Sequence, residues 1–201
     1  MDRYGLFVDA AYLYAAGGQL CYRTKNRAQL KLDFQQAVDD LRSLCSGCCG
    51  LKPLRTYWYD AATDAQPTPT HIAVASVEGV QLRLGRLTQG RQKGVDSRIV
   101  RDLIVLSYHR AITEAVLLSG DDDLREGVAE AQEVGVRVTL VGVAPLHGYQ
   151  NQAPTLVRQA DATLVLSKDE VLKFLTLRCP VSGPGVATAT APPPITPPST
   201  T

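Results

Sequence analysis

The sequence has no long hydrophobic run. None of its apolar stretches approaches the ~18 consecutive residues that a membrane-spanning helix requires. The first residues also lack the basic segment, apolar core and small-residue cleavage site of a secretory signal. We therefore expect a cytoplasmic protein that has no membrane among its partners.

Histidine and cysteine are too few and too scattered to predict a zinc site. The chain has five cysteines, which is an odd number, and three histidines that stand far apart. Cys45, Cys48 and Cys49 lie close together, but no second Cys or His pair follows at finger or ribbon spacing. We interpret these thiols as structural or incidental.

Neither sign of charge is in excess over the whole chain, whose formal net charge is +1. The sequence therefore lacks the strongly basic composition by which many nucleic-acid-binding domains are recognised. Positive charge is nevertheless concentrated locally, with six basic residues against one acid between Gln81 and Arg101. A second, acid-free cluster extends from Arg23 to Lys31. We expect both clusters to border the functional site, although a solvated surface is an equal alternative for either one.

The last 22 residues, from Pro180 to Thr201, contain no charged residue and hold seven of the twelve prolines. Such a segment cannot bury a core and is predicted to be disordered. The folded unit is therefore predicted to span residues 1–178, followed by a Pro/Thr-rich tail at residues 179–201. A unit of this length is expected to form one domain.

The remaining sequence alternates short apolar runs with helical patterns, which indicates βαβ units and a mostly parallel sheet. We predict strands at residues 4–9, 54–59, 80–84, 115–118, 136–142 and 162–166. Helices are predicted at residues 10–16, 32–44, 67–78, 95–110, 122–133 and 169–177. The third strand alternates apolar and polar residues, as an edge strand does. The first and fourth strands are expected side by side in the centre of the sheet.

Four aspartates fall where such a sheet would gather them. Asp9 ends the first predicted strand, Asp121 and Asp123 follow the fourth, and Asp96 begins a predicted helix. Open α/β sheets bind ligands at the carboxyl ends of their strands. Taken alone, Asp96 and Asp121 could each be no more than a helix cap. Asp9 shows the least evidence of a structural role, because a charge without a partner is penalised at the end of a buried strand.

A cluster of carboxylates without histidine or cysteine is an all-oxygen site, which suits Mg²⁺ or Mn²⁺. A bound cation would relieve the repulsion among the acids. It would also polarise a phosphate and lower the pKa of a water, so the sequence indicates phosphodiester chemistry. Asp102 lies ~9 Å further along the helix axis than Asp96 and is expected outside the site. Asp60 is interpreted either as an outer acid or as a turn residue.

The motifs that carry these acids resemble those of a known family. They are Gly5 to Leu13, Lys93 to Asp96, the Ser-Gly-Asp-Asp-Asp sequence within Leu117 to Leu124, and residues 160–162. Together they are similar to the NYN domain of the LabA-like branch, within the PIN-like nuclease superfamily. The resemblance covers residues 3 to about 175. It implies a three-layer α/β/α, PIN-like (Rossmann-like) fold and a metal-dependent ribonuclease that hydrolyses RNA phosphodiester bonds.

The resemblance also implies that the acidic site is catalytic and binds Mg²⁺ or Mn²⁺ through Asp9, Asp96, Asp121 and Asp123. We expect RNA, single-stranded or structured, as the partner. Its phosphates are expected to contact the basic residues Arg23, Lys25, Arg91, Lys93 and Arg98.

One departure from the family pattern concerns the residues that follow Asp9. Family members commonly have Gly-Asn there, whereas this chain has Ala10 and Ala11. The missing polar group is expected to weaken catalysis. The alternative is therefore a degenerate PIN-like module that binds RNA or a protein partner without turnover. The sequence leaves open the RNA target, the choice between endo- and exonuclease, and a homo-oligomeric state.

Overall fold

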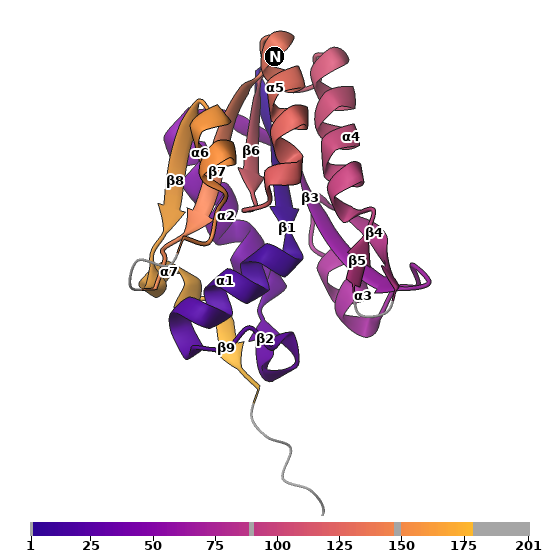
Figure 1. The fold of residues 1–201 in the computed structure, drawn as a ribbon, viewed down its shortest axis with the longest axis vertical. Helices are drawn as coiled ribbons and strands as arrows, with labels where there is room; N and C mark the ends of the chain where they lie inside the picture. The colour runs from indigo at the N-terminus through magenta and orange to yellow at the C-terminus, as the bar shows by residue number, and fades with distance from the viewer. Residues whose placement is uncertain (1, 89–90, 147–149, 179–201) are drawn as a thin grey trace, which may run out of the picture.

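A seven-stranded sheet lies between two layers of helices in the computed structural model, which describes residues 2–88, 91–146 and 150–178 (Figure 1). Six strands are parallel and one edge strand is antiparallel, so the predicted α/β/α fold with a mostly parallel sheet is confirmed. The tail predicted at residues 179–201 lies outside the described residues.

The strands of the main sheet occur in the order β5-β4-β3-β1-β6-β7-β8. Their bounds are β1 Arg3–Asp9, β3 Lys52–Thr63, β4 Val80–Thr88, β5 Arg91–Lys93, β6 Glu114–Leu118, β7 Arg137–Val143 and β8 Ala162–Leu166. A separate antiparallel ribbon pairs β2 Leu30–Leu32 with β9 Leu175–Leu177.

The helices are divided between the two faces of the sheet. One core contains residues of α4 Val95–Tyr108, α5 Arg125–Glu133 and α6 Pro154–Gln159, which lie on the near face in Figure 1. The opposite core contains residues of α1 Ala10–Tyr22, α2 Phe34–Cys49, α3 Pro69–Ala75 and α7 Lys168–Leu172. Two short 3₁₀ helices, η1 Arg27–Gln29 and η2 Asp122–Leu124, complete the described elements.

The almost continuously apolar sequence of β1 is explained by burial of the strand on both of its faces. Leu6 and Val8 pack into one core and Phe7 into the other, and all three side chains are fully buried. Both faces of a central parallel strand are covered by helices, so alternation of apolar and polar residues is absent. The same burial on both faces holds for β6, whose five residues are all buried.

The strand order reverses between β1 and β6, which are neighbours in the sheet as predicted. From β1 the order continues outward to β3 and β4, and from β6 it continues outward to β7 and β8. The helices that follow these two strands, α1 and α5, pack on opposite faces. Such a switch point opens a crevice at the carboxyl ends of the strands, where α/β proteins bind ligands.

Several predicted boundaries were wrong. The first helix does not stop at residue 16 but continues through Gly17 and Gly18 to Tyr22. The third predicted strand is not at the edge of the sheet, because β5 pairs with it. The last predicted helix, at residues 169–177, is replaced by α7 followed by β9. Strands β2, β5 and β9 and helix α6 were not predicted.

Position 18, buried inside α1, requires glycine because its surroundings leave no room for a side chain. An added Cβ would lie 2.5 Å from the Thr24 backbone oxygen and 2.6 Å from Leu30 Cδ1. We expect Gly18→Ala to destabilise the protein by about 1–3 kcal/mol through overpacking. Gly47→Ala is also in a helix, and no described atom lies within 4 Å of the added Cβ, so it should instead stabilise the protein by roughly 0.5–1 kcal/mol. Urea unfolding measures both, and equal effects of the two substitutions would contradict the packing argument.

Candidate functional site

Asp9 ends β1 and caps the N-terminus of α1. Its Oδ1 accepts hydrogen bonds from the backbone N–H groups of Ala11, at 3.0 Å, and Tyr12, at 3.2 Å. Its Oδ2 accepts a hydrogen bond of 2.9 Å from the hydroxyl of Ser119, just after β6. Asp9, which in the sequence shows the least evidence of a structural role, therefore has one: its carboxylate caps a helix and ties β1 to the loop that follows β6.

Asp96, Asp121 and Asp123 form an acidic group in which one carboxylate oxygen of each lies within 4.8 Å of the others. Asp96 is half-buried in the first turn of α4, and the other two are exposed around η2. Asp9 is not a member of this group. It lies close enough that the charge of Asp96 contributes to a raised pKa of Asp9. The structure thus brings three of the four predicted acids together and places the fourth within electrostatic reach of Asp96.

Asp96 and Asp121, which the sequence allowed as helix caps, have different local roles. The N-cap of α4 is Gly94, whose φ of 77° is left-handed and favours glycine, and no side chain among the described residues caps this helix. Asp96 is therefore not a cap. Asp121 does cap η2, since its carboxylate accepts a hydrogen bond of 3.1 Å from the Asp123 N–H. The turn that Asp121 stabilises also sets the position of Asp123.

The acids repel one another and are partly withdrawn from water. Burial raises the pKa of Asp9, hydrogen bonds from Tyr12 and Ser119 lower it, and the Asp96 charge raises it further. Burial also raises the pKa of Asp96, and the charges of Asp121 and Asp123 add to this increase. An all-carboxylate group with this repulsion fits a hard divalent cation, which would remove the conflict.

We expect Asp96→Asn to raise the melting temperature of the metal-free protein at pH 7. The pKa of Asp96 is raised in the folded state above 3.8, so folding favours the protonated carboxyl and stability falls as pH rises through that window. Asparagine removes this loss. The advantage should disappear below pH ~4, where Asp96 is protonated in both states. Melting curves of both proteins from pH 3.5 to 8 in EDTA measure it, and a difference independent of pH would contradict the repulsion.

Neighbouring acids have other partners. Asp122 interacts with Thr155 and lies 3.9 Å from Arg125. Asp102 accepts hydrogen bonds from the Tyr59 hydroxyl, at 3.0 Å, and from Arg83 Nε, at 2.8 Å. The expectation that Asp102 stands outside the acidic group is therefore confirmed.

Asp60 is neither a turn residue nor an acid of this group, because it lies within β3 and is buried. Its two oxygens accept hydrogen bonds of 2.6 and 2.5 Å from the Arg27 guanidinium. His71 Nε2 lies 3.2 Å away, and since its Nδ1 accepts a hydrogen bond from the Thr68 N–H, Nε2 carries the proton that is donated to Asp60. Arg27 also stacks over the Tyr14 ring at 4.2 Å. Asp60 thus anchors the basic segment after α1.

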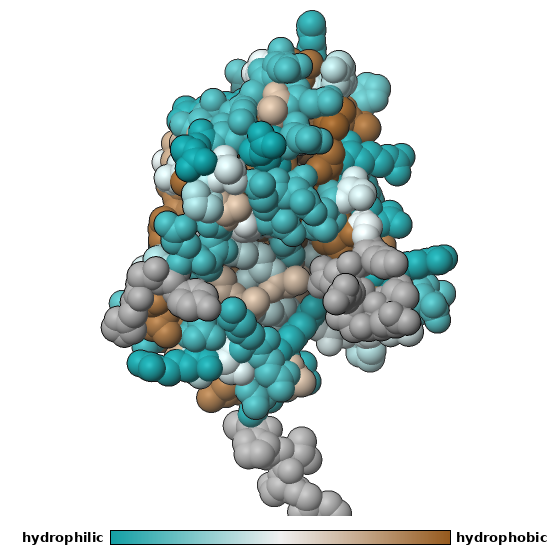
Figure 2. All heavy atoms as spheres, viewed as in Figure 1, coloured by the Kyte–Doolittle hydropathy of each residue, from teal (hydrophilic) through white to brown (hydrophobic). Residues whose placement is uncertain are grey.

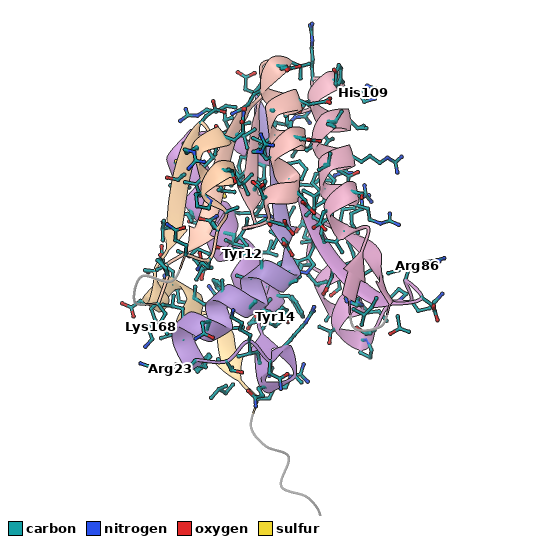
Figure 3. The ribbon with its side chains drawn as sticks, viewed as in Figure 1. Tyr12, Tyr14, Arg23, Arg86, His109 and Lys168 are labelled. Carbon is teal, nitrogen blue, oxygen red and sulfur yellow. The ribbon has the colours of Figure 1, made fainter. Side chains whose placement is uncertain are left out.

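The predicted basic residues lie on several elements. Arg23, at the C-cap of α1, and Lys25 are exposed on the segment after this helix, and Arg98 is exposed on α4, two residues after Asp96. The side chains of Arg91 and Lys93 lie outside the described part of the structure. Figure 3 shows Arg23 near the end of α1 and Arg86 on the opposite side of the molecule, in β4.

The acidic group opens onto a cavity of about 580 Å³ beside α4. Asp96, Asp123 and Arg101 contribute to its lining. Arg101 also lines a smaller cavity of about 280 Å³ with Arg83, Arg98 and Asp102. Arg101 therefore lines both the cavity of the acidic group and the neighbouring smaller cavity.

No helix within the described ranges is long and apolar enough to cross a membrane.

The sequence profile of the NYN domain matches residues 3–167. An uncharacterized protein, y4oD, from Sinorhizobium fredii (strain NBRC 101917 / NGR234) is 54% identical over 107 residues. That match covers 53% of this chain and 49% of y4oD, so it spans about half the length of this relative.

The crystal structure of a protein of unknown function, VPA0982, from Vibrio parahaemolyticus RIMD 2210633 has the same fold. It aligns with a TM-score of 0.59 at 21% identity, over 87% of this chain and 96% of VPA0982. The similarity supports the arrangement of helices and strands and carries no information on activity.

Proposed function

This chain belongs to the NYN domain family, and on that premise we propose that it is a metal-dependent ribonuclease of the LabA-like branch. The family implies a nuclease-like fold, and hydrolysis of RNA phosphodiester bonds is our proposal for its activity. One observation carries it. Three carboxylates, from Asp96, Asp121 and Asp123, approach within 4.8 Å of one another at the switch point of the sheet, where ligands bind.

In this proposal the three clustered carboxylates hold Mg²⁺ or Mn²⁺, and Asp9 contributes its charge from the adjacent buried position. When bound, the ion supplies Lewis acidity, which polarises the phosphate and makes an attacking water more acidic. The protein contributes the positioning. Ser119 and the start of α1 fix Asp9, and the η2 turn fixes Asp121 relative to Asp123.

The substrate would be held mainly through its phosphates. We propose that the exposed residues Arg23, Lys25 and Arg98, together with Arg91 and Lys93, attract the RNA backbone to this edge of the sheet. We place the activity in the cytoplasm, where the described free thiols, on Cys21, Cys45, Cys48 and Cys49, remain reduced.

Incubation with labelled single-stranded RNA in Mg²⁺, Mn²⁺ or EDTA tests the function. We expect cleavage with either metal and none in EDTA, and a metal-dependent rise in melting temperature because the ion binds the native state. Asp121→Asn should lose both responses. Asp122→Asn is the matched control, because this neighbouring acid lies outside the acidic group and should keep both. Absence of a metal-dependent melting shift and of cleavage in the unmodified protein would refute the proposal.

A second candidate function is a degenerate module that binds RNA or a protein partner. Ala11 favours it, because this residue offers Asp9 only a backbone N–H, whereas family members commonly have a polar side chain there. Binding of RNA without cleavage in any metal would support this alternative. If the missing amide is what limits turnover, Ala11→Asn should raise cleavage by about 10- to 100-fold.

RNA affinity should depend on salt because phosphate contacts release counterions. We expect the double variant Arg91→Ala/Lys93→Ala to bind more weakly and to flatten the plot of log affinity against log salt by about 1.4, or 0.7 per lost phosphate contact. The double variant Lys52→Ala/Arg137→Ala removes the same charge from the amino ends of β3 and β7 and should change the slope little. The slopes are measured by fluorescence anisotropy in EDTA. Equal slopes for the two double variants would show that Arg91 and Lys93 do not contact RNA phosphates.

A further inference from the structure

A third cavity, of about 480 Å³, lies between α1 and residues 150–154. Tyr12, Ala15 and Gln19 line it from α1, and Gly120 and Ala153 line it from the loops after β6 and β7. Its volume is within the range of roughly 300–1,000 Å³ that small-molecule sites occupy. In Figure 2, pale and tan residues form a band across a largely hydrophilic face, at the level of α1 in Figure 1.

This cavity adjoins the acids of the proposed ribonuclease site through two of its lining residues. Gly120 is followed directly by Asp121, and the Tyr12 N–H donates to Asp9. An added Cβ on Gly120 would lie 2.4 Å from the Asn151 backbone oxygen and 2.7 Å from the Tyr12 ring. The same close contacts that form the cavity wall therefore fix the loop that carries Asp121.

Hydrogen bonds fix Tyr12, Asn151 and Gln152 in the cavity wall. The Tyr12 hydroxyl donates to Asn151 Oδ1 at 3.2 Å and accepts from the Val143 N–H at 3.1 Å. Asn151 Nδ2 in turn donates to the Val143 carbonyl at 2.8 Å, and Gln152 Nε2 donates to the Ser119 carbonyl at 2.8 Å. An aromatic ring is thus fixed in the wall before any ligand arrives, which reduces the entropy cost of binding.

The chemistry of the lining matches a flat heterocycle with hydrogen-bonding edges. Tyr12 offers an aromatic surface, Ala15 leaves room beside it, and the Gln19 amide presents both a donor and an acceptor. Apart from Lys25, the lining residues in the described part of the chain are uncharged. An anion alone would be better matched by the cavity that Arg83, Arg98 and Arg101 line.

We propose that the cavity between α1 and residues 150–154 is a nucleobase subsite, which takes the base of the nucleotide whose phosphate lies at the acidic group. The inference rests on the proposed ribonuclease function. It adds that the protein grips its RNA by a base as well as by phosphates, and therefore prefers unpaired nucleotides, because a paired base cannot leave its stack to enter the cavity without a cost.

The test compares a single-stranded RNA with an oligomer of the same length built of abasic residues, by fluorescence anisotropy in EDTA. A base stacked on an aromatic ring strengthens binding, so we expect the unmodified protein to prefer the RNA about tenfold. Ala15→Leu fills the cavity without adding an aromatic ring and should abolish the preference while leaving affinity for the abasic oligomer unchanged. Ala73→Leu, the same change at an exposed position of α3, should preserve it.

Gln19→Leu provides a second variant should Ala15→Leu fail to fold, and it should reduce the preference at least severalfold. Equal affinity of the unmodified protein for both oligomers would overturn the proposal, as would a full preference in both cavity variants. If neither oligomer binds, the ribonuclease proposal fails and nucleoside monophosphates become the probe. Binding of a monophosphate that Ala15→Leu abolishes would support the subsite with a free nucleotide as its ligand, and no binding would overturn it.

Discussion

Replacing Asp60 with asparagine is expected to destabilise the protein by about 3 kcal/mol, the lower end of the range for a broken buried ion pair. The lower end applies because the Arg27 side chain is 36% exposed, whereas that of Asp60 is 1% exposed. Once unpaired, the guanidinium can turn toward water. Removal of Arg27 is different, because the Asp60 carboxylate is 1% exposed and, within the described ranges, retains only His71 as a donor from another element.

Arg27→Ala should therefore cost more stability than Asp60→Asn, although both remove the same ion pair. Urea unfolding at neutral pH measures the two values. The control is Asp102→Asn, because the Asp102 carboxylate, which pairs with Arg83, is 17% exposed, against 1% for Asp60. Water screens this pair more, so it should contribute about 1 kcal/mol or less. If Asp60→Asn lowers the free energy of unfolding no more than Asp102→Asn does, the Asp60–Arg27 ion pair contributes little to stability.

Replacement of Asp60 with asparagine should also affect RNA binding. Arg27 is on the segment that also carries Arg23 and Lys25, and Asp60 attaches that segment to β3. Loss of the anchor should lower RNA affinity even though Asp60 itself faces away from solvent. In Figure 3, Tyr14, whose ring stacks with Arg27, extends from α1 toward this segment.

The sequence predicted the fold where the pattern was local and repeated. Apolar strands and helical spacing identified the central sheet, and the continuous apolar character of β1 and β6 predicted burial on both faces. The sequence did not predict strands that are short or that pair with a segment far away in the chain. Strands β2 and β9 are three residues each and are separated by most of the chain, so no local pattern marks them. Gly17 and Gly18 indicated a helix end, but tertiary packing against Thr24, Leu30 and Leu175 requires their small size within the helix.

The acidic group was accessible to sequence reasoning because the ends of parallel strands meet at one edge of a sheet. The cap formed by Asp9 was missed, although an aspartate directly before a helical run is a recognised start signal. The Ser119 bond to Asp9 joins residues 110 positions apart, and the Arg27–Asp60 pair joins residues 33 apart. Neither contact leaves a mark in the local sequence, so only the three-dimensional arrangement reveals them.

Asp9→Asn is expected to lower RNA cleavage by about 100-fold or more while leaving the fold intact. Lost charge at the proposed metal site weakens stabilisation of the transition state, and each ~1.4 kcal/mol lost is a tenfold decrease in rate. The fold should persist because asparagine caps a helix about as well as aspartate. Its amide oxygen can accept the Ala11 and Tyr12 N–H bonds, and its NH₂ group can donate to Ser119. Stability within about 0.5 kcal/mol of the unmodified protein is therefore expected.

Asp9→Ala separates the two roles of this residue. It should lose cleavage to the same extent and also destabilise the protein by about 1–2 kcal/mol, because the first N–H groups of α1 lose their cap. Cleavage rates in Mn²⁺ and urea unfolding in EDTA on the same preparations measure both effects. Equal stability of the Asn and Ala variants would show that the cap contributes nothing. Cleavage by Asp9→Asn at the original rate would remove Asp9 from the proposed site and leave catalysis to Asp96, Asp121 and Asp123, the three acids that approach one another directly.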